Sequence, residues 1–172
     1  LEHTRTCMIL EDGEIAEVFD KYRDSMREQG AFDFDDLITM PLHLMATDSS
    51  VLERERARVE WVLVDEYQDV NRPQFSMMKM LAGKSPNIMV VGDPDQSIYG
   101  WRGADMSVIL GFERHFPGAK VVKLEQNYRS SGVILDAANA VIRNNVNRPD
   151  KRLWTDRSGG DLIEVAKLVD ER

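Results

Sequence analysis

The sequence predicts an α/β fold with a parallel sheet flanked by helices. Three short apolar runs rich in β-formers, Trp61–Val64, Ile88–Val91 and Val121–Leu124, alternate with stretches of helical periodicity. This strand–helix–strand spacing is typical of βαβ units. The first two runs end abruptly in carboxylates, beginning at Asp65 and Asp93. Buried parallel strands end in this way where they deliver ligand-binding groups to the carboxyl edge of a sheet.

The chain before the first strand is expected to be helical. Residues 1–13 give no clear signal and are unassigned or derive from cloning. From Glu14, apolar residues recur at steps of three and four until Gly30 stops the run. The predicted inner face of this helix consists of Ile15, Val18, Phe19, Tyr22 and Met26.

A second helix is predicted to start near Asp33. Pro41 is expected to kink or end it, because proline lacks a backbone N–H and clashes with the preceding turn. Asp48-Ser49-Ser50 is a predicted cap for a short charged helix over residues 51–58. The inner face of the second helix would carry Phe34, Leu37, Ile38 and Met45.

Further helices are predicted between and after the strands. They span Pro73–Leu81, with Gly83 as C-cap, and about Asp105–Phe116. Another follows Ser131, and Leu162–Val165 is expected to be the first strand of a further unit. The predicted inner face of the helix after Ser131 carries Ile134, Ala137, Ala138 and Val141.

Composition narrows the class of protein. A length of 172 residues suits one domain with a core, or one domain plus part of another. No run approaches the roughly 20 apolar residues that cross a bilayer, and no charged-then-apolar leader opens the chain. The single cysteine, Cys7, excludes an internal disulfide, and the three histidines have no metal-ligand spacing. We therefore expect a cytoplasmic protein without a membrane partner.

The net charge of -8 argues against coating nucleic acid with a basic surface. It is compatible with a motor that holds single strands in a channel by stacking.

Three long motifs occur in order: VDEYQD at residues 64–69, GDPDQSIYGWRGAD at residues 92–105 and LEQNYRSS at residues 124–131. Together with DFDDL at Asp33–Leu37, they closely resemble motifs of the UvrD/Rep/PcrA-type superfamily 1A DNA helicases. The resemblance runs from about Glu14 to about Thr155. It implies a P-loop NTPase fold of the RecA-like kind, with ATP and Mg²⁺ as cofactors.

The resemblance also implies roles at the nucleotide. Asp65 would bind magnesium and Glu66 would be the catalytic base, whereas Gln96 would sense the γ-phosphate. Tyr128 would stack on adenine and Arg129 would contact the γ-phosphate. From the residues alone, an acidic pair at a strand end is more often a solvated turn. The alternatives for the other two residues are that Gln96 is a turn residue and that Arg129 is an ion-pair partner of Glu125 or Asp136.

The SIYGWRGA stretch is the candidate DNA contact. Aromatic side chains in a loop either pack or stack, and base stacking contributes roughly 1–3 kcal/mol per base. By resemblance, Trp101 stacks on a base, with Tyr99 and Arg102 nearby on the strand. The alternative is that Trp101 is a core residue, as we expect Trp61 and Trp154 to be core or interface residues.

A phosphate-binding Walker A loop is the missing part. Gly83-Lys84-Ser85 matches only the tail of the motif, because Met78 stands where the first glycine belongs. We therefore expect this chain to be an internal segment of a longer helicase and to be inactive alone. Its expected partners are the Walker A segment and the second motor domain of the same helicase. The isolated segment is also expected to self-associate. The expected division is a helical segment from an inserted subdomain over 14–58, the later half of the first motor domain over 59–131, and a helix and the start of the second motor domain over 132–172.

The predicted function is ATP-dependent translocation on single-stranded DNA, or at a duplex–single-strand junction, in the 3′ to 5′ direction, in repair or replication. The alternative is a DNA-binding module that does not hydrolyse ATP. The presence of Asp65, Glu66, Gln96 and Arg129 argues against this alternative, because a module that does not hydrolyse ATP has no chemical use for them.

Overall fold

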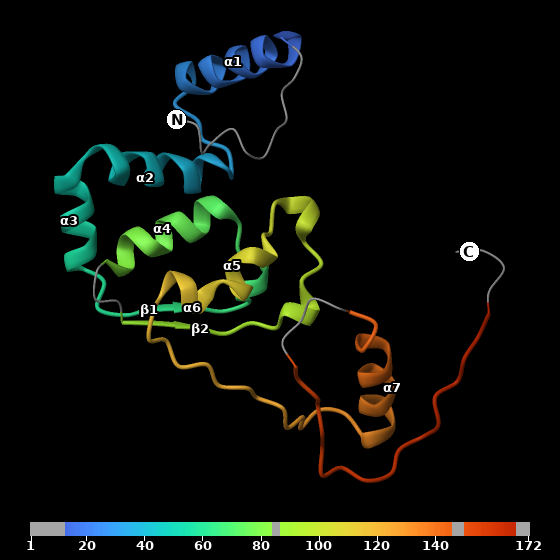
Figure 1. Ribbon diagram of the computed structural model, residues 1–172. Helices are drawn as coiled ribbons and strands as arrows, with labels where there is room; N and C mark the ends of the chain where they lie inside the picture. Colours follow the sequence, from blue (N-terminus) through green and yellow to red (C-terminus); the bar gives the residue numbers. More distant parts are fainter. Residues whose placement is uncertain (1–12, 84–86, 146–149, 168–172) are drawn as a thin grey trace. The chain divides into compact units, whose positions relative to one another are not determined.

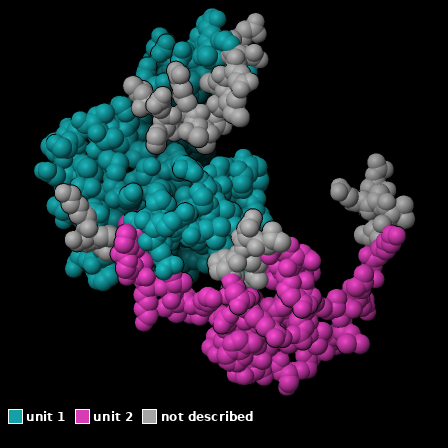
Figure 2. Space-filling model, viewed as in Figure 1, with its two compact units in different colours: residues 1–115 teal, residues 116–172 magenta. Residues whose placement is uncertain are grey.

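The computed structural model describes residues 13–83, 87–145 and 150–167 (Figure 1). The chain divides into two units, residues 1–115 and 116–172, coloured teal and magenta in Figure 2. Cys7, His3 and the Lys84-Ser85 pair lie outside the described residues. The architecture combines helices with a small parallel sheet, which agrees with the predicted mixed α/β class at this coarser level.

The first helix, α1 (Gly13–Glu28), forms where periodicity predicted it. Its apolar stripe is exposed, however: Val18 is 67% exposed and Ile15 48%. The hydroxyl of Tyr22 donates to Asp33 Oδ2 at 2.8 Å, so a hydrogen bond links this helix to the segment before the next one.

Helix α2 (Asp36–Thr47) begins three residues after the predicted start and runs through Pro41 to Thr47. Pro41 therefore does not end the helix, which was one of the two outcomes expected there. The helix packs against both α3 and α4, and that packing stabilises it despite the missing N–H. Met45 is buried as predicted and Ile38 is half-buried, whereas Leu37 is 60% exposed. Phe34 is 89% exposed because it precedes the helix.

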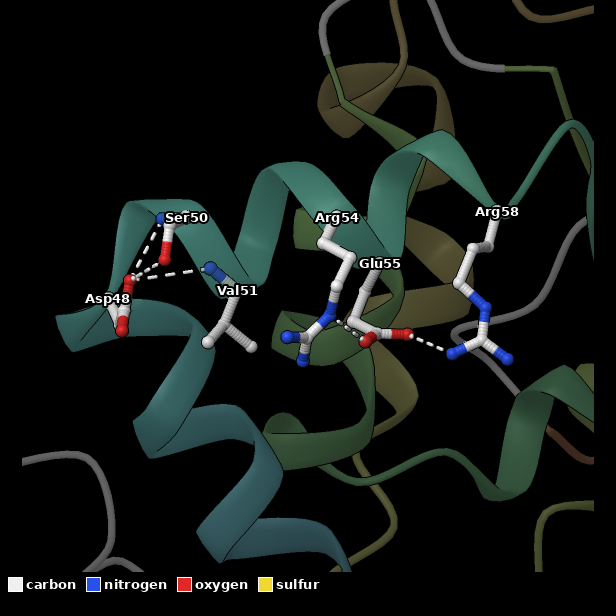
Figure 3. Close-up of polar contacts among 6 residues, drawn as sticks. All are labelled: Asp48, Ser50, Val51, Arg54, Glu55 and Arg58. Atoms are coloured by element: carbon white, nitrogen blue, oxygen red, sulfur yellow. Dashed lines mark hydrogen bonds and ion pairs between the residues drawn. The ribbon is translucent and has the colours of Figure 1, made fainter.

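Helix α3 (Ser49–Ala57) begins at the predicted cap (Figure 3). Oδ1 of Asp48 accepts the backbone N–H groups of Ser50 (2.9 Å) and Val51 (3.3 Å). The Ser50 hydroxyl also donates to Oδ1 at 2.6 Å. This bond contributes most, and the two N–H bonds add to it, in holding the pKa of Asp48 below its usual value. On the exposed side, Glu55 pairs with both Arg54 and Arg58 at 3.1 Å.

Strands β1 (Val62–Val64) and β2 (Ile88–Val90) are paired in parallel, with Leu63 opposite Met89. The predicted parallel pairing of these two runs is confirmed. Burial alternates, however, since Leu63 is 69% and Met89 58% exposed while their neighbours are half-buried. Among the described residues only one face of the sheet is covered, so full burial, typical of a parallel strand, is not seen.

Helix α4 (Arg72–Ala82) connects the two strands and packs against β1. It begins with a capping box, in which Asn71 and Gln74 exchange backbone-to-side-chain hydrogen bonds of 3.0 Å. It ends at Gly83, with φ 70°, which confirms the predicted C-cap.

Short helical turns follow both strands: η2 (Tyr67–Asp69) after β1, then η3 (Pro94–Gln96) and η4 (Gly100–Arg102) after β2. The helix predicted over about Asp105–Phe116 is present as two pieces, α5 (Met106–Leu110) and α6 (Phe112–His115). The break falls at Gly111, where an added Cβ would lie 2.6 Å from the Ser107 carbonyl oxygen.

In the second unit, the predicted strand Val121–Leu124 is not formed. These residues are extended but exposed, Leu124 to 76%, and no described strand pairs with them. Only an isolated parallel bridge between Gln126 and Trp154 is present. Leu162–Val165 likewise is not a strand, and Val165 is 93% exposed. β-Propensity describes fit to a half-buried surface, and these runs have no such surface here.

Helix α7 (Gly132–Ile142) confirms the predicted helix after Ser131, but its predicted inner face is wrong. Ile134 is 50% and Val141 70% exposed, whereas Leu135 is buried. One turn along from Leu135, Asn139 is half-buried and holds the backbone of Leu153, donating to its carbonyl at 2.8 Å and accepting its N–H at 3.2 Å.

Among the described residues, no helix is long and apolar enough to cross a membrane.

Candidate nucleotide and DNA site

The acidic pair lies at the carboxyl end of β1. Both Asp65 and Glu66 are exposed, and the N–H of Glu66 donates to Asp65 Oδ1 at 2.9 Å. Glu66 has left-handed backbone angles, φ 48° and ψ 43°, and is the one non-glycine residue with positive φ in the described part of the chain. Such a conformation costs on the order of 1–3 kcal/mol and is common at functional sites.

Gln68 joins this strand end to the next one. Its side chain is 2% exposed. Nε2 donates to Glu66 Oε2 at 2.7 Å, and Oε1 accepts the backbone N–H of Asp93 at 2.9 Å. The hydroxyl of Ser97 donates to the Gln68 carbonyl at 3.3 Å. The backbone adds a bond from Tyr67 N–H to the Val91 carbonyl at 2.9 Å.

Glycine at position 92 allows the Gln68 side chain and the Tyr67 backbone to lie close to the segment after β2. A Cβ at this position would lie 2.8 Å from Gln68 Oε1 and 3.0 Å from the Tyr67 nitrogen. Contacts under 3.0 Å are essentially never seen for real Cβ atoms, so glycine is the residue that admits the buried amide.

The loop after β2 positions Gln96. Asp93 caps η3 by accepting the N–H of Asp95 at 3.1 Å, so Asp93 acts as a turn former. Its other oxygen accepts Gln96 Nε2 at 2.8 Å. Glu66, Gln68, Asp93 and Gln96 therefore form one hydrogen-bonded series across the carboxyl ends of the two strands.

A cleft of about 380 Å³ opens beside the acidic pair. One carboxylate oxygen of Asp69, Oδ1, is buried there without a hydrogen-bond partner among the described residues. The neighbouring Tyr67 is fully buried, and burial raises its pKa to about 12. The lining residues are Val64, Asp65, Glu66, Asp69, Val70, Gln74 and Met78.

The loop at residues 99–102 presents an exposed aromatic platform. Trp101 is 75% exposed, so it is not a core residue. The Arg102 guanidinium lies 4.5 Å from the Trp101 ring centroid and 5.3 Å from that of Tyr99. Beyond the platform, an antiparallel bridge between Ala104 and Asn71 anchors the loop to the end of the acidic motif.

Tyr128 and Arg129 belong to the second unit, so the first unit's geometry does not include them. Tyr128 is 74% exposed, and its hydroxyl donates to Gln126 at 2.8 Å. The side chain of Asn127 accepts the N–H groups of Arg129 and Ser130, which shapes the turn before α7. In the described part of the chain, the Arg129 guanidinium makes no hydrogen bond or ion pair, and Glu125 instead accepts the Arg152 N–H.

Two family models match the chain. Residues 7–117 match the UvrD/REP helicase N-terminal domain, and residues 122–172 match the UvrD-like helicase C-terminal domain. The chain belongs to the UvrD/REP helicase family. The resemblance inferred from the three motifs is thereby confirmed.

Named relatives in this helicase family agree. The chain is 48% identical over 158 residues to an ATP-dependent DNA helicase PcrA from Staphylococcus epidermidis, covering 92% of the chain and 22% of the relative. It is 50% identical over 157 residues to the PcrA helicase of Leuconostoc citreum, covering 91% and 21%. The chain thus spans about a fifth of the length of these relatives.

Gln68, a member of the series, and Gly92, which lies against it, had no assigned role in the sequence prediction. Gln68 stood out only as an amide between two carboxylates of the DEYQD motif, and Gly92 only as the residue after a strand. Their importance depends on a contact between residues 24 positions apart, which no local pattern reveals. The two aromatic residues Trp61 (61% exposed) and Trp154 (47%) are not core residues either.

Proposed function

We propose that this chain is part of an ATP-dependent DNA helicase that translocates on single-stranded DNA. The observation that carries the proposal is the hydrogen-bonded series from Glu66 to Gln96, anchored beside an exposed aromatic platform. Such a linkage would connect nucleotide hydrolysis with a grip on bases. The parallel β1–β2 pair, connected by α4, supports a RecA-like P-loop sheet.

The acidic pair is assigned to the nucleotide. Asp65 would be the protein ligand of Mg²⁺, and Glu66 would orient and deprotonate the attacking water. Among the described residues no cluster of three or more metal-ligating side chains is present. One exposed carboxylate suffices for Mg²⁺, which keeps several waters and takes its remaining ligands from substrate phosphates. When bound, Mg²⁺ neutralises charge that develops on those phosphates.

The remaining site residues contact the two ligands. Gln96, held by Asp93, would report on the γ-phosphate through its amide. Arg129 has a guanidinium free of ion pairs with described residues, which supports a contact to the γ-phosphate. The exposed ring of Tyr128 would stack on adenine.

The platform is assigned to DNA. The exposed ring of Trp101 would stack on a base, with Tyr99 and Arg102 beside it. The proposed polymer is single-stranded DNA or a duplex–single-strand junction, read in the 3′ to 5′ direction. Unwinding of substrates with a 3′ or a 5′ overhang tests the direction, since only the former would be opened.

The domain division is part of the proposal. Residues 14–58 would lead from an inserted subdomain, 59–131 would belong to the first motor domain, and 132–172 would begin the second. Residues 116–131 belong to the first motor domain in this division, whereas they belong to the second of the two compact units.

The test is ATP hydrolysis by the full-length protein that carries this segment, with Mg²⁺, with and without single-stranded DNA. Glu66→Gln retains an acceptor for Gln68, so it should fold normally and reduce turnover about 10²- to 10⁴-fold. DNA-stimulated turnover that survives Glu66→Gln would refute the assignment of the base. Binding of DNA without any turnover in the unaltered protein would favour the non-hydrolysing module instead.

A further inference from the structure

Gln68 is the only polar side chain in the buried core of the described residues, and 2% of it is exposed. Burying an amide is favourable only when its donor and acceptor are both paired. The partners of the Gln68 amide are of opposite kinds: the carboxylates of Glu66 and, at 3.5 Å, Asp69 can only accept, and the Asp93 N–H can only donate. This set of partners is matched by an amide and by neither a carboxylate nor an apolar side chain.

The two hydrogen bonds of the Gln68 amide form a bridge with one arm to Glu66 and one arm to Asp93. The Glu66 arm acts on a side chain that is otherwise exposed. Glu66 lies on a strained, left-handed residue at the end of β1. A glutamate side chain in such a position would sample several rotamers, and the 2.7 Å bond from Gln68 Nε2 selects one of them. The bond leaves the second carboxylate oxygen, Oε1, for another partner.

The Asp93 arm connects the same amide to the neighbouring loop. The Asp93 backbone N–H donates to Gln68, and the Asp93 side chain accepts from Gln96. A displacement of the loop that carries Gln96 would therefore change the position of the Gln68 amide, and with it the orientation of Glu66.

We infer that Gln68 is a positioning residue for the hydrolytic reaction, which orients the Glu66 carboxylate and couples it to the loop that carries Gln96. The inference rests on the proposed role of Glu66 as the base. Gln68 touches neither water nor nucleotide in this role, because its side chain is enclosed and both ends of its amide are occupied.

Two substitutions separate the arms in the full-length protein. Gln68→Glu keeps an acceptor for the Asp93 N–H but replaces the donor that faces Glu66 with a like charge. Gln68→Met keeps the volume and removes both arms. Misplacing a catalytic group by about 1 Å costs up to about 100-fold, so we expect kcat to fall about 10- to 100-fold in both variants. The KM for ATP should change less than about twofold, since the binding groups are untouched.

A double-mutant cycle distinguishes positioning from a structural role. If Gln68 acts through Glu66, Gln68→Met should lower kcat much less in the Glu66→Gln background than in the wild type. The inference would be overturned if Gln68→Met lowered kcat by the same factor in both backgrounds. Full activity of Gln68→Glu would also overturn it. If Glu66→Gln alone retains kcat, the proposed function of Glu66 fails first, and the two failures are thereby told apart.

The control for stability is Met45→Ala. Met45 is buried in α2 and is not part of the series, and its truncation is expected to lower the unfolding midpoint. Assayed below its unfolding midpoint, Met45→Ala should keep kcat near the wild-type value. A kcat loss in this control as large as in Gln68→Met would mean that lost stability, rather than lost positioning, explains the Gln68 variants.

Discussion

The backbone N–H of Asp93 donates to the side-chain oxygen of Gln68 at 2.9 Å, which ties the end of β2 to the turn after β1. The Ser97 hydroxyl and the Tyr67 N–H add further hydrogen bonds between the same two segments, and both loops carry residues that we assign to the nucleotide. The geometry of this bond depends on Gly92, which directly precedes Asp93.

Gly92→Ala is expected to disturb the bridge. The added methyl group would lie 2.8 Å from Gln68 Oε1 and 3.0 Å from a backbone nitrogen, so the loop or the amide must move. We expect a loss of about 1–3 kcal/mol in the free energy of unfolding, measured by denaturant titration. Gly13→Ala is the control, because nothing lies within 4 Å of its added methyl group. Equal stability of the two variants would contradict this account of Gly92.

Trp101→Ala is expected to weaken binding of single-stranded DNA. A stacked base contributes about 1–3 kcal/mol, which corresponds to roughly a 5- to 150-fold rise in Kd. Fluorescence anisotropy of a labelled oligonucleotide measures the affinity at fixed salt. Trp61→Ala is the matched control, since Trp61 is also largely exposed in the first unit but lies outside the platform. An unchanged Kd for Trp101→Ala would remove Trp101 from the DNA site.

The free energy of unfolding should decrease at acidic pH because His115 becomes protonated. Burial, followed by the positive charges of Lys79, Arg114 and Arg72, lowers the pKa of His115 below 6.5. The unfolded chain therefore binds a proton at His115 more readily than the folded chain does. The stability that neutral His115 contributes is fully present above about pH 6.5 and is lost as the pH falls from there toward the folded pKa.

Denaturation midpoints at pH 7.5 and 5.5 test this prediction. The difference between the two midpoints should be smaller in His115→Gln than in the wild type. His43→Gln, at an exposed position of α2, serves as the control and should leave the difference unchanged. The same pH response in wild type and His115→Gln would show that another group is responsible.

The exposed sheet face predicts self-association of the 172-residue chain. Leu63 and Met89 lie opposite each other in the parallel pair, and both are more than half exposed. Contiguous apolar surface of this kind favours association. Light scattering should give a mass that rises with concentration, and the double variant Leu63→Lys/Met89→Lys should remain near 19.7 kDa.

Leu162→Lys is the control for that experiment, because Leu162 is 85% exposed but lies in an irregular segment. It should associate as the wild type does. A wild-type chain that stays monomeric at high concentration would contradict the prediction.

Local sequence signals predicted most of the first unit. The caps at Asp48 and Gly83 need only short-range chemistry, and the two strands are recognised by their apolar composition; all are present. The second unit was predicted less well. Asn139 takes an inner position on α7 because it satisfies both backbone groups of Leu153, whereas a periodicity argument counts apolar residues only.

The candidate site shows the same division between local and long-range information. The motifs indicated Asp65, Glu66 and Gln96 directly, since their chemistry is carried by residue type and order. The bridge through Gln68 was not predicted, because it requires that the turns after two strands meet. Val121–Leu124 illustrates the converse, since its composition favours a strand but no described strand pairs with it.

All three tryptophans of the chain are substantially exposed, at positions 61, 101 and 154. An indole already in water emits at long wavelength, so its emission spectrum shifts little when the polypeptide unfolds. Intrinsic emission is therefore a poor monitor of folding for this chain, and circular dichroism is the better choice. The same property makes Trp101 a built-in optical reporter: in a Trp61→Phe/Trp154→Phe background, quenching by an added oligonucleotide would come from that single ring.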